Sequence, residues 1–219
     1  MITHVKERYP NCESRFLHVH ELKIERDGRV IASMRALGAR IRDSWADLDE
    51  PHPYAVYTAN QELQDLFEGL FGYSPFEFHR DITAYGIRDE VLDTLDNLSG
   101  GLRVADKIDP LPNVLYLDNL FVDPQFRGQG LAGQLIQSLK NLSRTYDAVF
   151  LEASPFLTDF GNKEEQARLR AKLRSLYSKH GFSPVSGDHP YMIATFAALS
   201  PRPKKAVVQP ATQELGLSI

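Results

Sequence analysis

The chain has little of what disulfide-stabilised or metal-binding proteins need. Cys12 is the only cysteine among 219 residues, so no internal disulfide can form, and no His or carboxylate partners stand at the spacing of a zinc site. His18 and His20 alternate along an expected strand and share one face. A surface or core pair fits them better than a metal site, and we expect no metal cofactor.

Long apolar runs and excess positive charge are also missing. No stretch approaches the roughly 20 apolar residues that cross a bilayer, and the first ten residues lack the apolar core of a signal peptide. We therefore expect a cytoplasmic protein with no membrane partner. The formal net charge is −4, which argues against a nucleic-acid partner. A homodimer is a possible assembly.

What the chain does contain suits one folded domain. Hydrophobic residues make up 42% of the sequence, enough to bury a single core. We expect one domain over residues 1–200 and a flexible tail over residues 201–219, which are rich in proline and polar side chains. Residues 59–100 show the periodicity of two helices, the second ended by Gly100 and Gly101.

Strand patterns stand on both sides of that helical segment. Residues 16–24 and 30–37 flank Asp27 and Gly28, a strong hairpin turn. Residues 114–122 form a nearly continuous apolar run, as expected of a strand covered on both faces. Residues 148–153 form the next strand, and strand–helix–strand predicts a parallel pair. The buried stripe of the intervening helix is Leu131, Leu135, Ile136, Leu139 and Leu142.

A further helix and a closing hairpin follow. Leu169, Leu173, Leu176 and Tyr177 share one helical face, and Gly181 is expected to cap that helix. Pro184 and Val185 begin the hairpin, and residues 191–199 complete it.

The turn after residue 122 carries the clearest functional signal. Gly128 and Gly130 bring backbone N–H groups close to a ligand, and the helix start adds unpaired donors and a positive dipole end. Such a turn suits a pyrophosphate, with Arg127 adding charge. A tight connection without a ligand is the alternative. No Lys-Ser or Lys-Thr follows the glycines, which excludes a P-loop.

The same glycines fit a rival motif. Gly128, Gly130 and Gly133 also satisfy the dinucleotide fingerprint, with Glu152 about 20 residues onward as the ribose-binding acid. The fingerprint normally follows its strand directly, whereas five residues intervene here. A dinucleotide-dependent oxidoreductase would also need further strand–helix–strand units.

The string from Val122 to Ala132 resembles the acetyl-CoA signature Q/R-x-x-G-x-G/A of the GNAT superfamily of N-acetyltransferases. Over residues 114–199 this resemblance implies an α/β fold with a central mixed, mostly antiparallel sheet, a splayed parallel strand pair and flanking helices. It implies acetyl-CoA as co-substrate and a primary amine of a small molecule or protein as acceptor, with residues 59–100 shaping the acceptor side. The implied coenzyme-binding residues are Leu120, Phe121, Val122, Arg127, Gly128, Gln129, Gly130, Leu131 and Ala132.

The resemblance also implies catalytic roles. Residues 116–122 are similar to the Tyr-Leu-Glu-Asp-Phe-Phe-Val segment of polyamine acetyltransferases, whose first acid acts as base. Asp118 takes that position, and its shorter side chain favours a water relay. Glu152 is the second choice. Tyr177 lies in a segment like the family's Tyr-x-x-x-Gly-Phe helix end, where the hydroxyl is beside the CoA sulfur, so it becomes the candidate acid.

Purely structural roles would also explain these two residues. Asp118 interrupts an apolar strand, where an unpaired carboxylate is costly, and a structural hydrogen bond to neighbouring backbone would also explain it. Tyr177 lies on an apolar stripe that equally suits a core tyrosine. A non-catalytic acyl-CoA-binding regulatory module is therefore the main alternative function.

Overall fold

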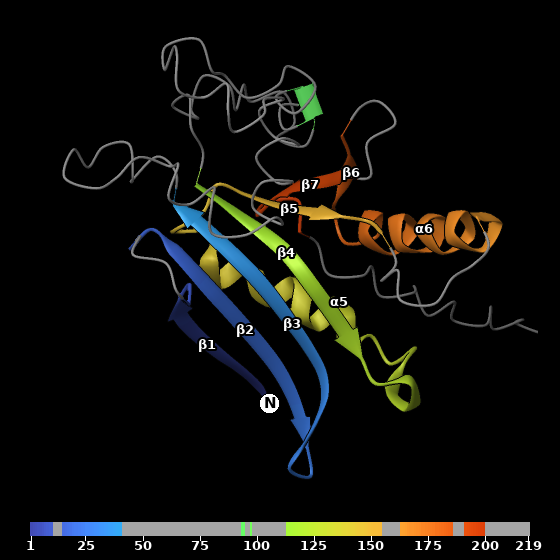
Figure 1. Ribbon diagram of the computed structural model, residues 1–219, viewed down its shortest axis with the longest axis horizontal. Helices are drawn as coiled ribbons and strands as arrows, with labels where there is room; N and C mark the ends of the chain where they lie inside the picture. Colours follow the sequence, from blue (N-terminus) through green and yellow to red (C-terminus); the bar gives the residue numbers. More distant parts are fainter. Residues whose placement is uncertain are drawn as a thin grey trace, which may run out of the picture.

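The computed structural model describes residues 1–10, 15–40, 93–94, 97, 113–154, 163–185 and 191–199. Their strands form one seven-stranded sheet in the order β1-β2-β3-β4-β5-β7-β6 (Figure 1). The strands are β1 (Ile2–Arg8), β2 (Leu17–Arg26), β3 (Arg29–Arg40), β4 (Asn113–Val122), β5 (Ala148–Glu152), β6 (Ser183–Pro184) and β7 (Tyr191–Thr195). The helices are α5 (Leu131–Ser138) and α6 (Lys163–Ser178), with 3-10 turns η2 (Pro124–Phe126) and η3 (Leu139–Leu142).

The predicted mixed α/β sheet is confirmed. Only β4 and β5 pair in parallel within the described sheet, and the other neighbours are antiparallel. Helix α5 provides the crossover between the parallel strands. Because β7 then pairs antiparallel to β5, this sheet is not the doubly wound parallel sheet that a dinucleotide-dependent oxidoreductase would need.

The hairpin of β2 and β3 follows from its turn residues. Asp27 and Gly28 have φ values of 53° and 75°, the left-handed conformations that a two-residue hairpin turn requires. Strand β1 was not predicted. It is an edge strand whose residues are largely exposed on both faces, so its sequence shows no apolar alternation.

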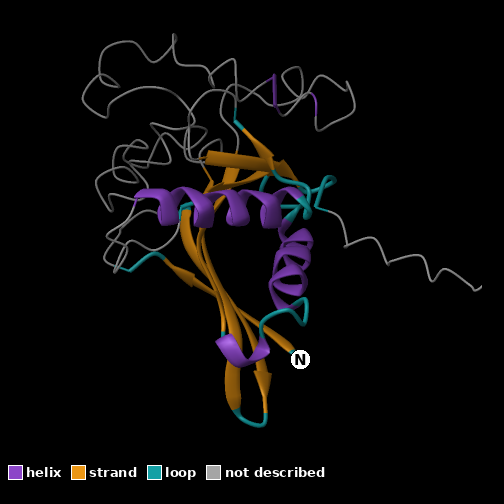
Figure 2. Ribbon diagram, turned by 90° about the vertical axis from the view of Figure 1, so that its right-hand side faces the viewer, coloured by secondary structure: helices purple, strands orange, loops and turns teal. Residues whose placement is uncertain are grey.

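Helices cover one face of the sheet. Leu131, Leu135, Ile136 and Leu139 pack from α5 and η3 into a core that includes Met34 and Leu117. Figure 2 shows α5 on one side of the sheet, with α6 running across it. The predicted cap is also present, because the N–H of Gly181 bonds to Ser178 O at 3.1 Å and that of Phe182 to Tyr177 O at 3.2 Å. This pair of bonds is a Schellman motif.

The expected helices over residues 59–100 and the tail over residues 201–219 lie outside the described residues, apart from Asp93, Thr94 and Asn97. These three are helical. None of the helices in the described part of the chain is both long and apolar enough to cross a membrane.

His18 and His20 do share a face, and His20 is buried. His20 contacts His4 Nε2 through Nδ1 at 3.1 Å and Tyr146 Oη through Nε2 at 2.9 Å. Burial lowers the pKa of His18 to about 4 and that of His20 to about 3, and nearby charge, including Lys6, adds to this. Both imidazoles are therefore neutral in the folded protein at neutral pH.

Acid should destabilise the protein through this pair. An unfolded histidine takes up its proton near pH 6.5, whereas the folded state binds it only near pH 3–4. The stabilisation is complete above pH 6.5 and is lost as the pH falls from there toward 3. Denaturant unfolding at pH 7, 6, 5 and 4 measures this slope, and His20→Gln should make it shallower. An unchanged slope would show that His20 does not control it.

Candidate active site

A cleft of about 1210 Å³ lies between the second half of β4, the turn after it, the start of α5 and the inner side of α6. Ligand pockets in proteins span roughly 300–1,000 Å³, so this cleft accommodates a long cofactor. Its described lining residues are Asn119, Leu120, Phe121, Val122, Phe126, Arg127, Gly128, Gly130, Leu131, Ala132, Gly133, Gln134, Gln137, Arg168, Ala171, Lys172, Leu173, Ser175, Leu176, Tyr177, Lys179 and His180.

The cleft begins where β4 and β5 stop pairing. Their register runs from Val114 opposite Ala148 to Leu117 opposite Leu151, while β4 continues to Val122. A bulge lies at this point, because β3 pairs with Leu117 and then with Asn119 and skips Asp118. A bulge bends its strand and increases the twist. Among the described strands, none pairs with the β5-facing edge of β4 beyond Leu117, as the predicted splayed pair requires.

Exposure changes along β4 at the same point. Residues 113–117 are buried, whereas residues 118–122 are alternately half-buried and exposed, and Phe121 is 47% exposed. The sequence predicted a strand covered on both faces, and that is correct only for the first half. An extended ligand can therefore lie along the second half and bond to its backbone.

The glycine turn presents its backbone to the cleft. Gly128 and Gly130 have φ values of 79° and 80°, and a Cβ at either would meet no atom within 4 Å. Gly130 is the N-cap of α5 and has no side chain to bond the first N–H groups of the helix. Unpaired donors and the positive helix end together suit an anionic group.

Positive side chains line the same cleft as this turn. Arg127, Arg168, Lys172 and Lys179 line the cleft, and its described lining contains no Asp or Glu. Arg127 is held in place by a bond from its Nε to Val122 O at 3.3 Å. A basic cleft in a chain of net charge −4 indicates an anionic ligand.

Tyr177 lies on the wall of the cleft, near the end of α6. Its side chain is 8% exposed and contacts the Phe182 ring at 5.7 Å between centroids. Burial raises its pKa to about 12, so the phenol stays protonated through the physiological range. A protonated hydroxyl at a cleft wall can donate a proton to a leaving group.

The two candidate bases lie away from this lining. Asp118 forms an ion pair with Arg35 through its Oδ2. Ala32, Met34 and Ala36 of β3 belong to the core on the helix side, so Arg35, by strand alternation, faces the opposite side of the sheet. Glu152 ends β5 and accepts a hydrogen bond from Ser154 Oγ at 2.6 Å. Both carboxylates thus already have a bonding partner.

The structure brings most of the predicted site residues together. Eight of the nine predicted coenzyme residues and Tyr177 line the cleft, whereas Gln129, Asp118 and Glu152 do not. Sequence reasoning missed the basic side of α6. A signal for it existed, because Arg168, Lys172, Ser175 and Lys179 recur at helical spacing beside the apolar stripe.

The apolar stripe of α6 is less buried than its pattern predicted. Leu169, Leu173 and Leu176 are only half-buried, and Tyr177 alone is buried. Leu173 and Leu176 line the cleft, so one side of each faces the cleft, although Leu173 also packs against the core.

The glycine turn, the splayed strand edge and the basic cleft together suit a ligand with an anionic group and an extended arm. Comparison with protein families agrees, because the model described as "Acetyltransferase (GNAT) domain" matches residues 87–184. By this match, residues 87–184, just under half of the chain, resemble a GNAT acetyltransferase domain.

Comparisons with curated sequences and with solved structures were also made, and the structural similarities are low. No curated protein sequence matches the chain significantly. The structure is similar to a Tyr-to-Phe mutant of KacT, at 11% identity over 84% of this chain and 74% of that one (TM-score 0.40). It is also similar to AtaTR bound with AcCoA, at 13% identity over 84% and 73% (TM-score 0.38). A Drosophila melanogaster polyamine N-acetyltransferase shares 16% identity over 80% and 74% (TM-score 0.34).

Proposed function

We propose that this enzyme moves an acetyl group from acetyl-CoA directly to a primary amine of a small molecule or protein, within a ternary complex. One observation carries the proposal, namely that the glycine turn at the start of α5 opens onto a basic cleft beside the edge of β4 that no described strand covers. Residues 1–200 would form the catalytic domain, with residues 59–100 on the acceptor side.

The coenzyme would be held by three parts of the cleft. Its diphosphate would lie on the backbone N–H groups from Gly128 to Ala132, with Arg127 adding charge. Its pantetheine would run along residues 120–122 of β4 like an added strand. Lys172 and Lys179 would attract the remaining phosphate charge from the α6 side.

Starting from the ammonium form, the nitrogen loses two protons, one before attack and one as the amide forms, and the departing sulfur gains one. The neutral amine attacks the thioester carbon, a backbone N–H at the splayed edge stabilises the oxyanion, and collapse breaks the carbon–sulfur bond. Tyr177 would protonate the departing sulfur, and the second proton of the attacking nitrogen would return to the Tyr177 oxygen as the amide forms. A phenol with a pKa of about 12 is fully protonated at neutral pH and can fill this role.

A free alkylamine has a pKa of about 10, so it must lose a proton before it attacks. Asp118 would accept this proton through a water, with Glu152 as the second candidate. The pairing of Asp118 Oδ2 with Arg35 supports an indirect role, because Arg35 already occupies one carboxylate oxygen.

An amine panel with acetyl-CoA, followed by free-thiol release, tests the proposal. We expect thiol release that depends on the amine, with the acetylated amine as product. Tight CoA binding without thiol release for any small amine or protein acceptor would instead favour the acyl-CoA-binding regulatory module. Longer acyl-CoAs in the same assay measure acyl preference.

A further inference from the structure

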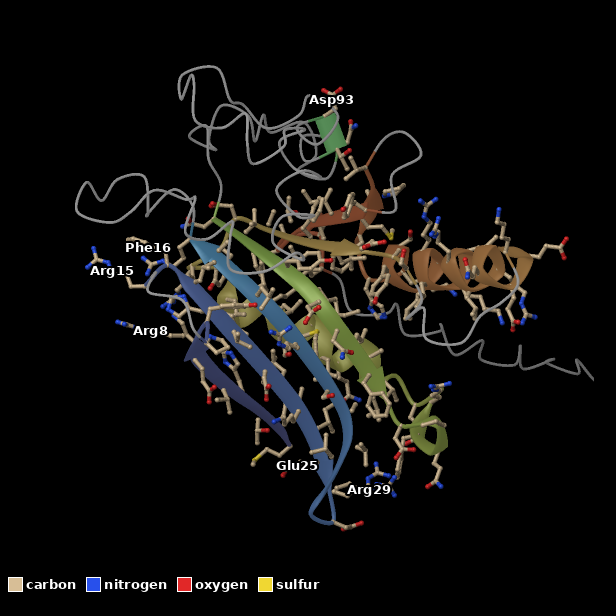
Figure 3. The ribbon with its side chains drawn as sticks, in the orientation of Figure 1. Arg8, Arg15, Phe16, Glu25, Arg29 and Asp93 are labelled. Carbon is tan, nitrogen blue, oxygen red and sulfur yellow. The ribbon has the colours of Figure 1, made fainter. Side chains whose placement is uncertain are left out.

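The tip of the β2–β3 hairpin touches the turn that leads from β4 to the glycines. Arg29 Nη2 donates a hydrogen bond to Asp123 Oδ2 at 2.5 Å. The Asp123 side chain is 9% exposed and that of Arg29 is 63% exposed. The backbone N–H of Asp123 also bonds to Ile31 O at 3.0 Å. Figure 3 shows Arg29 at this hairpin tip, far from Arg8 at the other end of the strands.

Asp123 in turn organises the residues before the glycines. Its Oδ1 accepts the N–H of Gln125 at 3.0 Å, and its carbonyl accepts the N–H of Phe126 at 2.8 Å. It is therefore the N-cap of η2. Since only Arg127 separates η2 from Gly128, the position of Asp123 sets where the glycine turn begins.

A second contact from the same hairpin strengthens the first. The guanidinium of Arg26 lies 5.4 Å from the centroid of the Phe126 ring. Phe126 lines the cleft and packs against the core. The hairpin tip therefore contacts both ends of η2. Arg29 forms an ion pair with Asp123, the N-cap, and Arg26 makes a cation–π contact with Phe126, the last residue.

We propose that Arg29 and Asp123 are a positioning pair for the coenzyme diphosphate, reinforced by Arg26. The inference rests on the proposed function. Gly128 and Gly130 give the turn great conformational freedom, and an anion site is effective only when its donors are held in place. The ion pair restricts that freedom from outside the cleft, without touching the ligand.

The test compares two acetyl donors that differ in the diphosphate. For Arg29→Met we expect kcat/KM with acetyl-CoA to fall about fivefold, which corresponds to the upper range for an exposed ion pair. The value of kcat should stay within about twofold. With acetyl-pantetheine, which has no diphosphate, kcat/KM should not change.

Asp123→Asn provides a second variant and completes a double-mutant cycle. It keeps the size of the side chain but removes the charge, and it should lower kcat/KM with acetyl-CoA at least as much as Arg29→Met does. Adding Arg29→Met to Asp123→Asn should then have little further effect, because the pair is already broken. Arg8→Met is the matched control, since it removes the same charge from an exposed arginine far from the turn.

Three results would overturn the proposal. These are unchanged kinetics in both single variants, an equal loss with both donors, or an equal loss in the Arg8→Met control. If the wild-type protein released no thiol from acetyl-CoA with any amine acceptor, the proposed function itself would be refuted, and the same assay shows this before any variant is compared.

Discussion

Replacing Tyr177 with Phe is expected to lower kcat roughly 100-fold, at the lower end of what a general acid contributes. The variant removes only the hydroxyl that would protonate the departing CoA sulfur. Within the described residues this hydroxyl has no hydrogen bond to lose, and the ring keeps its contact with Phe182. The Kd for CoA and the melting temperature should therefore stay nearly unchanged. Free-thiol release measures kcat, and calorimetric titration with CoA measures Kd.

A matched control and the pH profile sharpen this test. Tyr191→Phe removes a hydroxyl outside the cleft, where Tyr191 stacks on Phe150 at 5.1 Å, and it should retain wild-type kcat. Because the pKa of Tyr177 is raised to about 12, its proton-donating form persists as the pH rises, and wild-type kcat should show no tyrosine-dependent loss below about pH 10. Equal kcat values for wild type and Tyr177→Phe would exclude Tyr177 from the mechanism.

Replacing Gly181 with Ala is expected to lower the free energy of unfolding by about 3 kcal/mol, since a left-handed backbone and an overpacked site each cost on the order of 1–3 kcal/mol. Gly181 has a φ of 93°, and a Cβ there would lie 1.9 Å from the backbone oxygen of Ala198. The obstacle is backbone, so it cannot rotate away. Denaturant unfolding followed by circular dichroism measures the loss.

Gly28→Ala separates the two contributions. Gly28 has a similar φ of 75°, but its Cβ would meet nothing within 4 Å. It should cost only about 1 kcal/mol, the penalty of the left-handed conformation alone. If the two variants lost the same stability, the close approach of Ala198 to Gly181 would have no energetic consequence.

Local sequence signals predicted several structural elements around the cleft correctly. The glycines, the helix after them and the Schellman cap at Gly181 depend on backbone conformations that few other residues adopt, so a short window of sequence is enough to recognise them. The hairpin turn at Asp27 and Gly28 is predictable for the same reason. Strand β1 was missed because an edge strand exposed on both faces needs no apolar alternation.

Longer-range features could not be predicted in this way. The ion pair between Arg35 and Asp118 joins residues 83 positions apart, and the pair of Arg29 and Asp123 joins residues 94 apart. Nothing near Asp118 in the sequence indicates an arginine on the neighbouring strand. Its interruption of an apolar strand did indicate that it needs a partner or a cavity, and the partner is Arg35.

The sequence by itself determined the elements that depend on neighbouring residues, namely the turn, the helix periodicities and the family signature after β4. The tertiary structure decided which side chains meet. It placed a strand bulge at Asp118, next to the point where the pairing of β4 with β5 stops, and it left Leu173 and Leu176 of the α6 stripe lining a cleft. The physical reason is that backbone propensities act over a few residues, whereas strand register and ion pairs depend on contacts that exist only after the chain has folded.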